Sequence, residues 1–519
     1  MGKAKRAWIK LAAVTAMLLM LTSCIRLQVP GITSAGTATP TPTSTATPAV
    51  TPSVAPTMQD ASGKRPVYND TDRPKYDIQI KFDEKNHSAT ATERILYTNT
   101  AAERMNELYL HIYPNHFSKK EYVDMTFSSP DEAAYPDDKF NPGWIKITNL
   151  TADGDPVTFQ IQGKDDTVLK IPLETPLMKG KQIELKMDFT LQVPHRMGRY
   201  AWGETGTNFA NWYPIMAMYD HDGWNLDPYY ELGDPFYSET ADYSVRIEMP
   251  AGMEAAFTGD VKGDTTENGR RVLALSETGV RDFAFVLSRK YKIGSEEVDG
   301  ITVRVAMPKE DDGMMDTMMR YATQAVDIYD RHFGRYTNDT LTVAFVDDYG
   351  GMEYPGIVFI DASLLKDEDS GFFLMECVVH EIGHQWWYSA VGNDEVEEPW
   401  LDESLTSFTE LVYIDEAVIE DLFSHDSGEE PYLKLPLQRS LPEFKGWDDY
   451  AYIYTFGQQF FAELMNKMGE DEFFGMLQKY YAKYAYGIAT SADLRALVAE
   501  TGNKEALAWF DKGVYGKAN

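Results

Sequence analysis

The spacing of hydrophobic residues changes once along this chain, near residue 308, and this change restricts the possible folds more than any other feature. Before it, apolar residues mostly alternate with polar ones, which is the pattern of half-buried β-strands. After it, apolar residues recur at helical spacing, first from Met314 to Phe333, where Gly334 is the expected end of a helix. The chain therefore predicts a multi-domain α+β protein: an all-β domain of sandwich or saddle type, then a mainly helical domain with a small mixed sheet.

The predicted strands of the first half are separated by turn signals such as Asp-Gly and Asn-Gly. They are Tyr76–Phe82, Leu108–Tyr113, Val168–Ile171, Gln182–Leu191, Tyr243–Met249, Val272–Leu275, Phe283–Leu287 and Ile301–Val305. In the second half, Leu341–Val346 and Ile357–Ile360 are predicted as short strands on either side of a glycine-rich loop. The aromatic stretch Tyr200–Tyr237 has no clear period. Two interpretations stay open for it: core between strands, or a surface that faces substrate or another domain.

The first residues indicate an export signal. Positive charges up to Lys10 precede an apolar run, Leu11–Leu21, which is shorter than the roughly 20 residues that a membrane-spanning helix needs. The run ends in Leu21-Thr22-Ser23-Cys24, which resembles the lipobox of bacterial lipoproteins. The resemblance implies cleavage before Cys24, lipid on Cys24, and an extracytoplasmic protein anchored to the membrane at the bacterial cell surface. An ordinary secretory signal with a chance cysteine is the alternative.

These patterns divide the chain into four segments. Residues 1–23 are the predicted lipoprotein signal peptide, and residues 24–73 are a tether rich in Thr, Pro, Ser and Ala, which buries too little apolar surface to fold. Residues 74–307 form the predicted β domain, and residues 308–519 the mainly helical domain.

Composition excludes two classes of function. The chain has 48 Lys and Arg against 81 Asp and Glu, a formal net charge of −33, so it would repel nucleic acid. Its two cysteines, Cys24 and Cys377, are too few for a disulfide framework or for a cysteine-ligated zinc site. Cys377 lies among apolar residues and is expected to be a small buried side chain.

The sequence His380-Glu381-Ile382-Gly383-His384 lies inside an apolar, helix-like segment, Phe372–Tyr388. Residues four apart share one face of a helix, so both imidazoles can converge on one metal ion. Glu381 lies about 100° round the helix, where its carboxylate can reach a water molecule at the metal without binding the metal. A catalytic zinc site needs a third protein ligand and leaves one position for water.

Glu403 is the expected third ligand. Eighteen residues separate it from His384, Gly392-Asn393-Asp394 predicts a turn, and Trp400-Leu401-Asp402-Glu403 opens a second helix. A helix-turn-helix can return Glu403 to the histidine face. Two histidines and a glutamate are the ligand set of hydrolytic zinc sites, so we predict one catalytic Zn²⁺, with another divalent metal as the alternative.

This arrangement resembles the membrane alanyl aminopeptidase (aminopeptidase N) family of gluzincin zinc metallopeptidases. Gly350-Gly351-Met352-Glu353-Tyr354, whose glutamate lies 27 residues before His380, is similar to the family's Gly-x-Met-Glu-Asn exopeptidase motif. Glu410 follows Glu403 by seven residues, as in the family's ligand helix, and Tyr454-Thr455-Phe456-Gly457 resembles the segment that carries the family's catalytic tyrosine. The resemblance covers roughly residues 75–500, and its specific motifs lie between 350 and 457.

The resemblance implies a thermolysin-like catalytic domain and a zinc-dependent aminopeptidase that removes N-terminal residues from peptides. Glu381 would be the general base, and Tyr454 would donate a hydrogen bond to the oxyanion. Glu353 would pair with the free α-ammonium of the substrate. Met352 would belong to the same substrate-binding loop, in which Gly350 and Gly351 let the backbone approach the substrate.

Two departures from the family pattern keep other functions open. Tyr354 replaces the usual asparagine of the exopeptidase motif, and Asn211-Trp212-Tyr213-Pro214 replaces the common pattern before the catalytic domain. The chain also ends about 65 residues after Tyr454, so we expect a site more open than in the long members, which have a large helical C-terminal domain. A zinc endopeptidase and a non-catalytic peptide-binding surface lipoprotein are the alternatives. The acids from Asp394 to Glu398 are expected to form a solvated face, which could still favour cationic peptides.

Overall fold

The computed structural model describes residues 65–69, 71–123, 134–136, 139–348, 350–367, 370–418 and 435–516. All of them belong to one compact unit, Lys64–Asn519. Cys24, the predicted signal peptide and most of the predicted tether lie outside the described residues, so these predictions stay predictions. Within the described part of the chain, no helix combines the length and the apolar composition that crossing a membrane requires.

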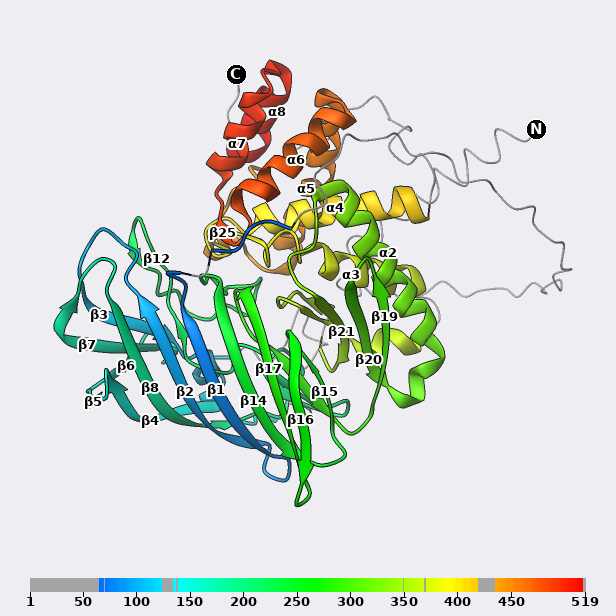
Figure 1. Ribbon diagram of the computed structural model, residues 1–519. Helices are drawn as coiled ribbons and strands as arrows, with labels where there is room; N and C mark the ends of the chain where they lie inside the picture. Colours follow the sequence, from blue (N-terminus) through cyan, green and yellow to red (C-terminus); the bar gives the residue numbers. More distant parts are fainter. Residues whose placement is uncertain are drawn as a thin grey trace, which may run out of the picture. The chain divides into compact units, whose positions relative to one another are not determined.

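An eight-stranded sheet dominates the first half, in the strand order β16-β17-β14-β1-β2-β8-β4-β5. Its strands are β1 (Lys75–Asp83), β2 (Ser88–Thr98), β4 (Trp144–Ala152), β5 (Asp155–Pro156), β8 (Gln182–Gln192), β14 (Ala241–Pro250), β16 (Asp260–Glu267) and β17 (Arg270–Val280). β1 pairs in parallel with β14, and the other neighbours pair antiparallel. Burial alternates along β1, so Ile78, Ile80 and Phe82 enter the core, and Figure 1 shows the long strands as one curved layer.

Smaller sheets pack against this layer and share its core. Their strand orders are β15-β18-β10-β9, β11-β3-β7-β6 and β12-β13. The strands are β3 (Met105–His111), β6 (Gln160–Gln162), β7 (Val168–Leu177), β9 (Ala201–Trp202), β10 (Thr207–Phe209), β11 (Ile215–Met216), β12 (Tyr219–Asp220), β13 (Gly223–Trp224), β15 (Glu254–Phe257) and β18 (Phe285–Ser288). Trp212 and Tyr213 are almost fully buried in the shared core, so the aromatic stretch Tyr200–Tyr237 is largely inter-strand core.

A mixed sheet of five strands begins the second half, in the order β19-β20-β21-β23-β22. It contains β19 (Tyr291–Val298), β20 (Ile301–Pro308), β21 (Thr340–Val346), β22 (Gly351–Met352) and β23 (Ile357–Asp361). β20, β21 and β23 are parallel and their residues are mostly buried, as in sheets covered on both faces. β22 pairs antiparallel with β23 at the edge, and this pairing sets the position of the residue after it, Glu353.

Helices make up most of the remaining described chain: α2 (Met315–Phe333), α3 (Gly371–Gly383), α4 (Trp400–Ala417), α5 (Trp447–Met468), α6 (Glu470–Tyr484), α7 (Ser491–Glu500) and α8 (Lys504–Tyr515). α2 ends at Gly334, whose φ of 121° is a conformation that glycine adopts readily, as its sequence predicts. The residues Leu374–Gly383 of α3 are all buried, which explains why this segment is apolar on every side. The β region followed by helices and a small mixed sheet confirms the predicted α+β fold class.

Candidate functional site

Three side chains from two adjacent helices converge on one point. His380 lies in the last turn of α3, His384 caps that helix, and Glu403 lies in the first turn of α4. Their potential ligand atoms all lie within 4.8 Å of one another. The two Nε2 atoms are 3.1 Å apart, and Glu403 Oε2 lies 3.3 Å from each of them. The structure thus brings together the three residues that the spacing selected.

Neighbouring groups orient both imidazoles. His380 Nδ1 donates to the Glu410 carboxylate, which lies two turns further along α4. His384 Nδ1 donates to the carbonyl of Trp387 over 2.9 Å and lies 3.2 Å from the Thr406 hydroxyl. Because each Nδ1 carries a proton that is already donated, each Nε2 presents its lone pair at the common point, as a metal ligand must.

The charges around this point favour a cation. Burial tends to lower the pKa of both histidines, but nearby carboxylates outweigh it. Glu410 and Glu403 raise the pKa of His380 well above its ordinary value. Glu353 and Glu403 raise the pKa of His384 to about 10. Burial raises the pKa of Glu403, yet the two histidines hold it well below its ordinary value. A site that stabilises imidazolium so strongly also stabilises a divalent cation in place of those protons. The donor set of two imidazoles and one carboxylate fits zinc.

Glu381 lies beside these ligands without joining them. It is buried, and burial raises its pKa to about 8 against the opposing effect of His380. A Cβ atom added to Gly351 would lie 2.2 Å from Glu381 Oε1, so only glycine lets the strand β22 lie this close to the carboxylate. The structure gives Gly351 a close contact with Glu381, and its predicted role in the approach to substrate stays a prediction.

Glu353 follows β22 and lies beside the metal ligands. It is 3% exposed, and its Oε1 atom has no hydrogen-bond partner among the described residues. Oxygen atoms of Glu353 and Asp402 and a nitrogen of His384 lie within 4.8 Å of one another. Gly350 has a φ of 77°, which suits the turn into β22, and Met352 is fully buried. The predicted loop therefore delivers to the edge of the site one buried carboxylate with an unpartnered oxygen, Oε1.

Gln385 is a positioning residue that the sequence did not reveal. Its side-chain amide donates to the carbonyl groups of Glu353 and Tyr354, over 3.4 and 3.3 Å, and its Oε1 accepts from the Gly356 amide over 2.8 Å. It is fully buried directly after His384, so it ties the loop that bears Glu353 to the end of α3. The available signal was a polar residue directly after His384, followed by three aromatic residues.

The two departures from the family pattern contact each other. The Tyr354 hydroxyl donates to Asn211 Oδ1 over 2.7 Å, and both side chains are buried. Asn211 has a φ of 50° and also donates to Asp282 over 2.8 Å. Tyr354 therefore links its loop to the β region, while the neighbouring Glu353 keeps its place beside the metal ligands.

Tyr454 reaches the same centre from α5. Its hydroxyl donates to Glu403 Oε1 over 2.5 Å, and its ring stacks on that of His380 with centroids 5.8 Å apart. The approach depends on Gly457, because a Cβ atom there would lie 2.0 Å from Ser404 Oγ on α4. Four segments, the loop after β22, α3, α4 and α5, thus supply the predicted site residues.

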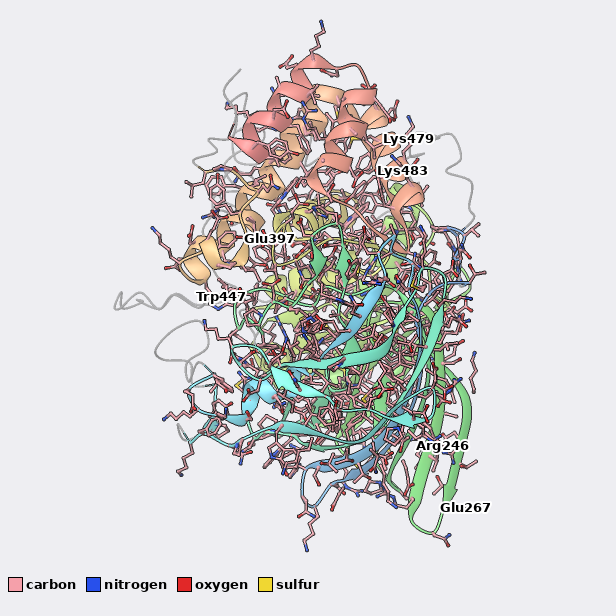
Figure 2. All side chains as sticks on the ribbon, turned by 90° about the vertical axis from the view of Figure 1, so that its left-hand side faces the viewer. Arg246, Glu267, Glu397, Trp447, Lys479 and Lys483 are labelled. Atoms are coloured by element: carbon pink, nitrogen blue, oxygen red, sulfur yellow. The ribbon has the colours of Figure 1, made fainter. Side chains whose placement is uncertain are left out.

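The expected solvated face from Asp394 to Glu398 is only partly correct. Glu397 is exposed, and Figure 2 labels it. Glu395, however, is 2% exposed, and neither of its carboxylate oxygens has a hydrogen-bond partner among the described residues. Asp402, which precedes the ligand Glu403, is equally buried. Periodicity could not reveal this, because these acids lie in and beside a loop without regular spacing.

Comparison with known proteins agrees with this geometry. Residues 315–438 match the model of the Peptidase family M1 domain. The chain is 28% identical to Tricorn protease-interacting factor F2 of Thermoplasma volcanium over 53% of this chain and 38% of that protein. It is 22% identical to Aminopeptidase M1-B of Oryza sativa over 69% of this chain and 44% of that protein. The chain thus spans less than half the length of both relatives.

The fold also has solved counterparts. The M1 zinc metallopeptidase from Deinococcus radiodurans superposes with a TM-score of 0.59 at 16% sequence identity, over 86% of this chain and 94% of that one. The succession of β region and helices is therefore shared with that structure. Together these matches confirm the resemblance that the motifs between residues 350 and 457 predict.

Proposed function

We propose that this chain, which carries a peptidase family M1 domain, is a zinc-dependent aminopeptidase. His380, His384 and Glu403 would hold the ion, with Glu410 orienting His380. A zinc ion held there lowers the pKa of a bound water and polarises the scissile carbonyl. The observation that carries the proposal is the buried Glu353 carboxylate: its Oε1 atom has no hydrogen-bond partner among the described residues, and one of its oxygens lies within 4.8 Å of a His384 nitrogen.

Glu381 is the general base of the proposed reaction. It accepts a proton from the attacking water as the water oxygen bonds to the carbonyl carbon. It then returns this proton to the amide nitrogen, whose bond to carbon breaks as the amine leaves. Its buried surroundings, with Gly351 packed against it, hold the carboxylate in place and limit competing solvent.

Tyr454 stabilises the negative oxygen that forms on the carbonyl carbon. Its hydroxyl already lies 2.5 Å from Glu403, so a small rotation redirects the hydrogen bond to a substrate oxygen beside the same ligand. Burial raises the pKa of Tyr454 well above its ordinary value, so the hydroxyl keeps its proton and remains a donor. Fixed donors of this kind stabilise the transition state more than the ground state.

Glu353 makes the proposed enzyme an exopeptidase. A buried carboxylate oxygen without a hydrogen-bond donor, as Glu353 Oε1 is, is costly unless a cation pairs with it. The α-ammonium of a peptide supplies that charge only at a free N-terminus. Binding it beside the metal ligands places the first peptide bond of the substrate, and no later one, at Glu381.

Chromogenic amides of single amino acids test this proposal. We expect hydrolysis of the alanyl amide and loss of nearly all activity on its N-acetylated form, because acetylation removes the α-ammonium. Equal rates on both would contradict the exopeptidase proposal. Cleavage inside a peptide blocked at both ends would favour a zinc endopeptidase that uses the same ligands. No cleavage of any of these substrates by zinc-loaded protein would favour a peptide-binding protein.

The N-terminal sequence supports a second part of the proposal, attachment to the bacterial cell surface through lipid on Cys24. The Cys24→Ala variant should then appear in the medium or the soluble extracellular fraction, whereas the unchanged chain stays with the membrane and carries lipid detectable by mass spectrometry. An unmodified Cys24 in the mature protein would indicate an ordinary secretory signal or none.

A further inference from the structure

Glu395 is a second buried carboxylate that the proposed reaction does not use. It is 2% exposed, and both of its oxygens lack a hydrogen-bond partner among the described residues. A carboxylate that is removed from water without donors is strongly destabilised unless a cation completes its surroundings. Nothing in the reaction steps derived above explains why this residue is an acid.

Other acids act on Glu395. Burial and the negative charges of Asp402, Glu353 and Asp234 act on it together and raise its pKa well above the ordinary value. Asp402 is 2% exposed and accepts a hydrogen bond at Oδ1 from Asn393 over 3.0 Å. The Tyr388 hydroxyl is also buried without a partner among the described residues. Two of the acids that act on Glu395, Asp402 and Glu353, also lie close to a nitrogen of the metal ligand His384, so negative charge accumulates beside the metal ligands.

The cations nearby are already engaged. The guanidinium of Arg199 pairs with Asp234 and donates to the Gly233 carbonyl over 3.1 Å. Arg281 donates to main-chain carbonyls, including those of Ser238 over 2.9 Å and Tyr388 over 2.7 Å. Within the part of the chain that the structure describes, neither guanidinium forms a hydrogen bond or an ion pair with Glu395, although the charge of Glu395 acts on Arg281. Both Glu395 oxygens are therefore left for a ligand.

The arrangement fits an organic cation better than a second metal ion. A nitrogen of His384 lies within 4.8 Å of carboxylate oxygens of Glu353 and Asp402. However, His384 Nε2 faces the proposed zinc position beside His380, and His384 Nδ1 donates to the Trp387 carbonyl, so neither nitrogen is available for a second metal ion. Glu395 belongs to none of the compact ligand groups found in the described chain. Acceptors that do not converge on one point suit a guanidinium or an ammonium group at the end of a long side chain, because such a group carries several donors and no acceptor.

We infer that Glu395, with Asp402, binds the side-chain cation of the substrate's N-terminal residue, so that the enzyme prefers peptides that begin with arginine or lysine. The inference rests on the proposed function, because Glu353 must hold the α-ammonium for the side chain of the same residue to extend to Glu395. One residue then supplies a cation to both buried carboxylates: its α-ammonium pairs with Glu353 and its side chain with Glu395.

Arginyl and citrullyl amides test this directly, because citrulline keeps the size and shape of arginine and lacks its charge. A hydrogen bond to a charged group contributes about 1.5–3 kcal/mol, so kcat/KM should favour the arginyl amide roughly 10- to 150-fold. In Glu395→Gln this ratio should fall toward one. Glu397→Gln removes the same charge from the exposed part of the same loop, and the ratio should stay at its wild-type value.

Three results would overturn the inference. They are a wild-type ratio near one, a ratio that survives in Glu395→Gln, and an equal loss on both amides in Glu395→Gln, which would assign Glu395 to the α-ammonium. The wild-type ratio needs no variant, so a ratio near one overturns the inference even if Glu395→Gln does not fold.

Binding separates this inference from the proposed function. If the zinc-loaded protein cleaves alanyl amide but shows no charge preference, the inference fails and the proposed function stands. If it cleaves no amide, calorimetry with free L-arginine and L-citrulline replaces kinetics. Preference for arginine that is lost in Glu395→Gln would then support the cation site alone, and equal affinity would reject it.

Discussion

Glu381 and Gly351 are packed so closely that the position of the carboxylate depends on a residue with no side chain. At the scale of single residues, the site is built from such paired constraints. His380 is oriented by Glu410, His384 by the Trp387 carbonyl, and each pairing leaves one nitrogen for the metal. Replacing one partner should therefore change chemistry before it changes the fold.

Glu381→Gln should lower kcat strongly while zinc stays bound. The amide has nearly the shape of the carboxylate but cannot accept the proton, and a general base contributes about 10²- to 10⁴-fold. We expect kcat on alanyl amide to fall by that factor, with one zinc per chain by elemental analysis. Glu416→Gln removes an acid from the distal end of α4, next to Arg331, and should leave kcat unchanged. Undiminished hydrolysis in Glu381→Gln would reject the mechanism.

Tyr454→Phe should lower kcat far more than it changes KM. The variant loses the donor beside Glu403, and the loss of one oxyanion donor costs about 10²- to 10³-fold in rate. Tyr452→Phe is the matched control, because its hydroxyl lies on the same helix but contacts Leu435. Steady-state kinetics with separate kcat and KM values make the comparison. If kcat of Tyr454→Phe equals that of wild type, the hydroxyl does not stabilise the oxyanion and has only a structural role.

At the scale of elements, α4 and α5 pack in close contact, and this contact joins a metal ligand to the catalytic tyrosine of the proposed reaction. Ser404 on α4 donates to the Ile453 carbonyl on α5 over 2.6 Å, and Gly457 lies against the same serine. Gly457 is also the last residue of the Tyr-x-x-Gly segment. The glycine of that motif thus has a packing reason, which the sequence alone does not state.

Gly457→Ala should separate α5 from α4. Overpacking typically costs about 1–3 kcal/mol, which exceeds the roughly 1 kcal/mol that alanine gains over glycine within a helix. We expect a lower free energy of unfolding in urea and a lower kcat, since Tyr454 moves away from Glu403. Gly475→Ala in α6 meets no atom within 4 Å and should be neutral or stabilising. Equal stability of both variants would show that α5 accommodates the methyl group without moving.

A buried ionic network joins separate elements of the β region. His116 Nδ1 lies 3.0 Å from Asp165 and its Nε2 lies 3.3 Å from Glu231, which also pairs with Arg196. Burial lowers the pKa of His116, but the hydrogen bonds of the two carboxylates outweigh it and raise that pKa above its ordinary value. Burial tends to raise the pKa of Glu231, but Arg196 and His116 outweigh it and lower this pKa to about 2.

This network predicts a pH-dependent stability. Because the folded-state pKa of His116 is raised, its contribution is fully present below the unfolded value of 6.5 and is lost as pH rises through the folded value. His116→Gln should therefore lower the free energy of unfolding by roughly 3 kcal/mol near pH 6, and by less near pH 9. Urea titrations at both values test this. A difference between variant and wild type that does not change with pH would mean that His116 is neutral in the folded protein.

At the scale of the whole described molecule, Arg281 connects the β region to the catalytic region. It follows β17 and donates to the carbonyls of Tyr388 and Ala390, just after the metal-binding helix, and to that of Gly487 in β25 (Gly487–Ile488). Burial lowers its pKa to about 10, yet it stays charged at neutral pH. Tyr388 takes the unusual φ of 128°, and Arg281 contacts the backbone at this residue.

Arg281→Met should destabilise the protein and slow catalysis together. Methionine fills much of the space but leaves buried carbonyls without donors, a loss of roughly 3–5 kcal/mol for a buried charged group. The melting temperature should fall, and kcat should fall because the segment after His384 loses its support. Arg246→Met, on the exposed face of β14 and labelled in Figure 2, should change stability by no more than about 0.5 kcal/mol. Equal melting temperatures for the two variants would contradict this role of Arg281.

Sequence patterns were sufficient wherever the cause is local. His380 and His384 share a face because a helix places residues four apart together, and α2 ends at Gly334 because glycine adopts its backbone angles without strain. The strand β2 was missed, since its inward positions include Ala89, Ala91 and the fully buried Glu93, which weaken the apolar alternation. The boundaries at residues 74 and 308 and the catalytic roles stay predictions.

The amino-acid sequence by itself determined the succession of strands and helices and the pairing of two histidines, because short-range backbone geometry sets both. Only the tertiary structure decided that Tyr354 contacts Asn211, that Gln385 holds the loop of Glu353, and that Glu395 is buried rather than solvated. These contacts join residues separated by loops, so their existence depends on how sheets and helices pack. An acid in a loop has the same sequence signature whether water or protein surrounds it, and packing alone makes the difference.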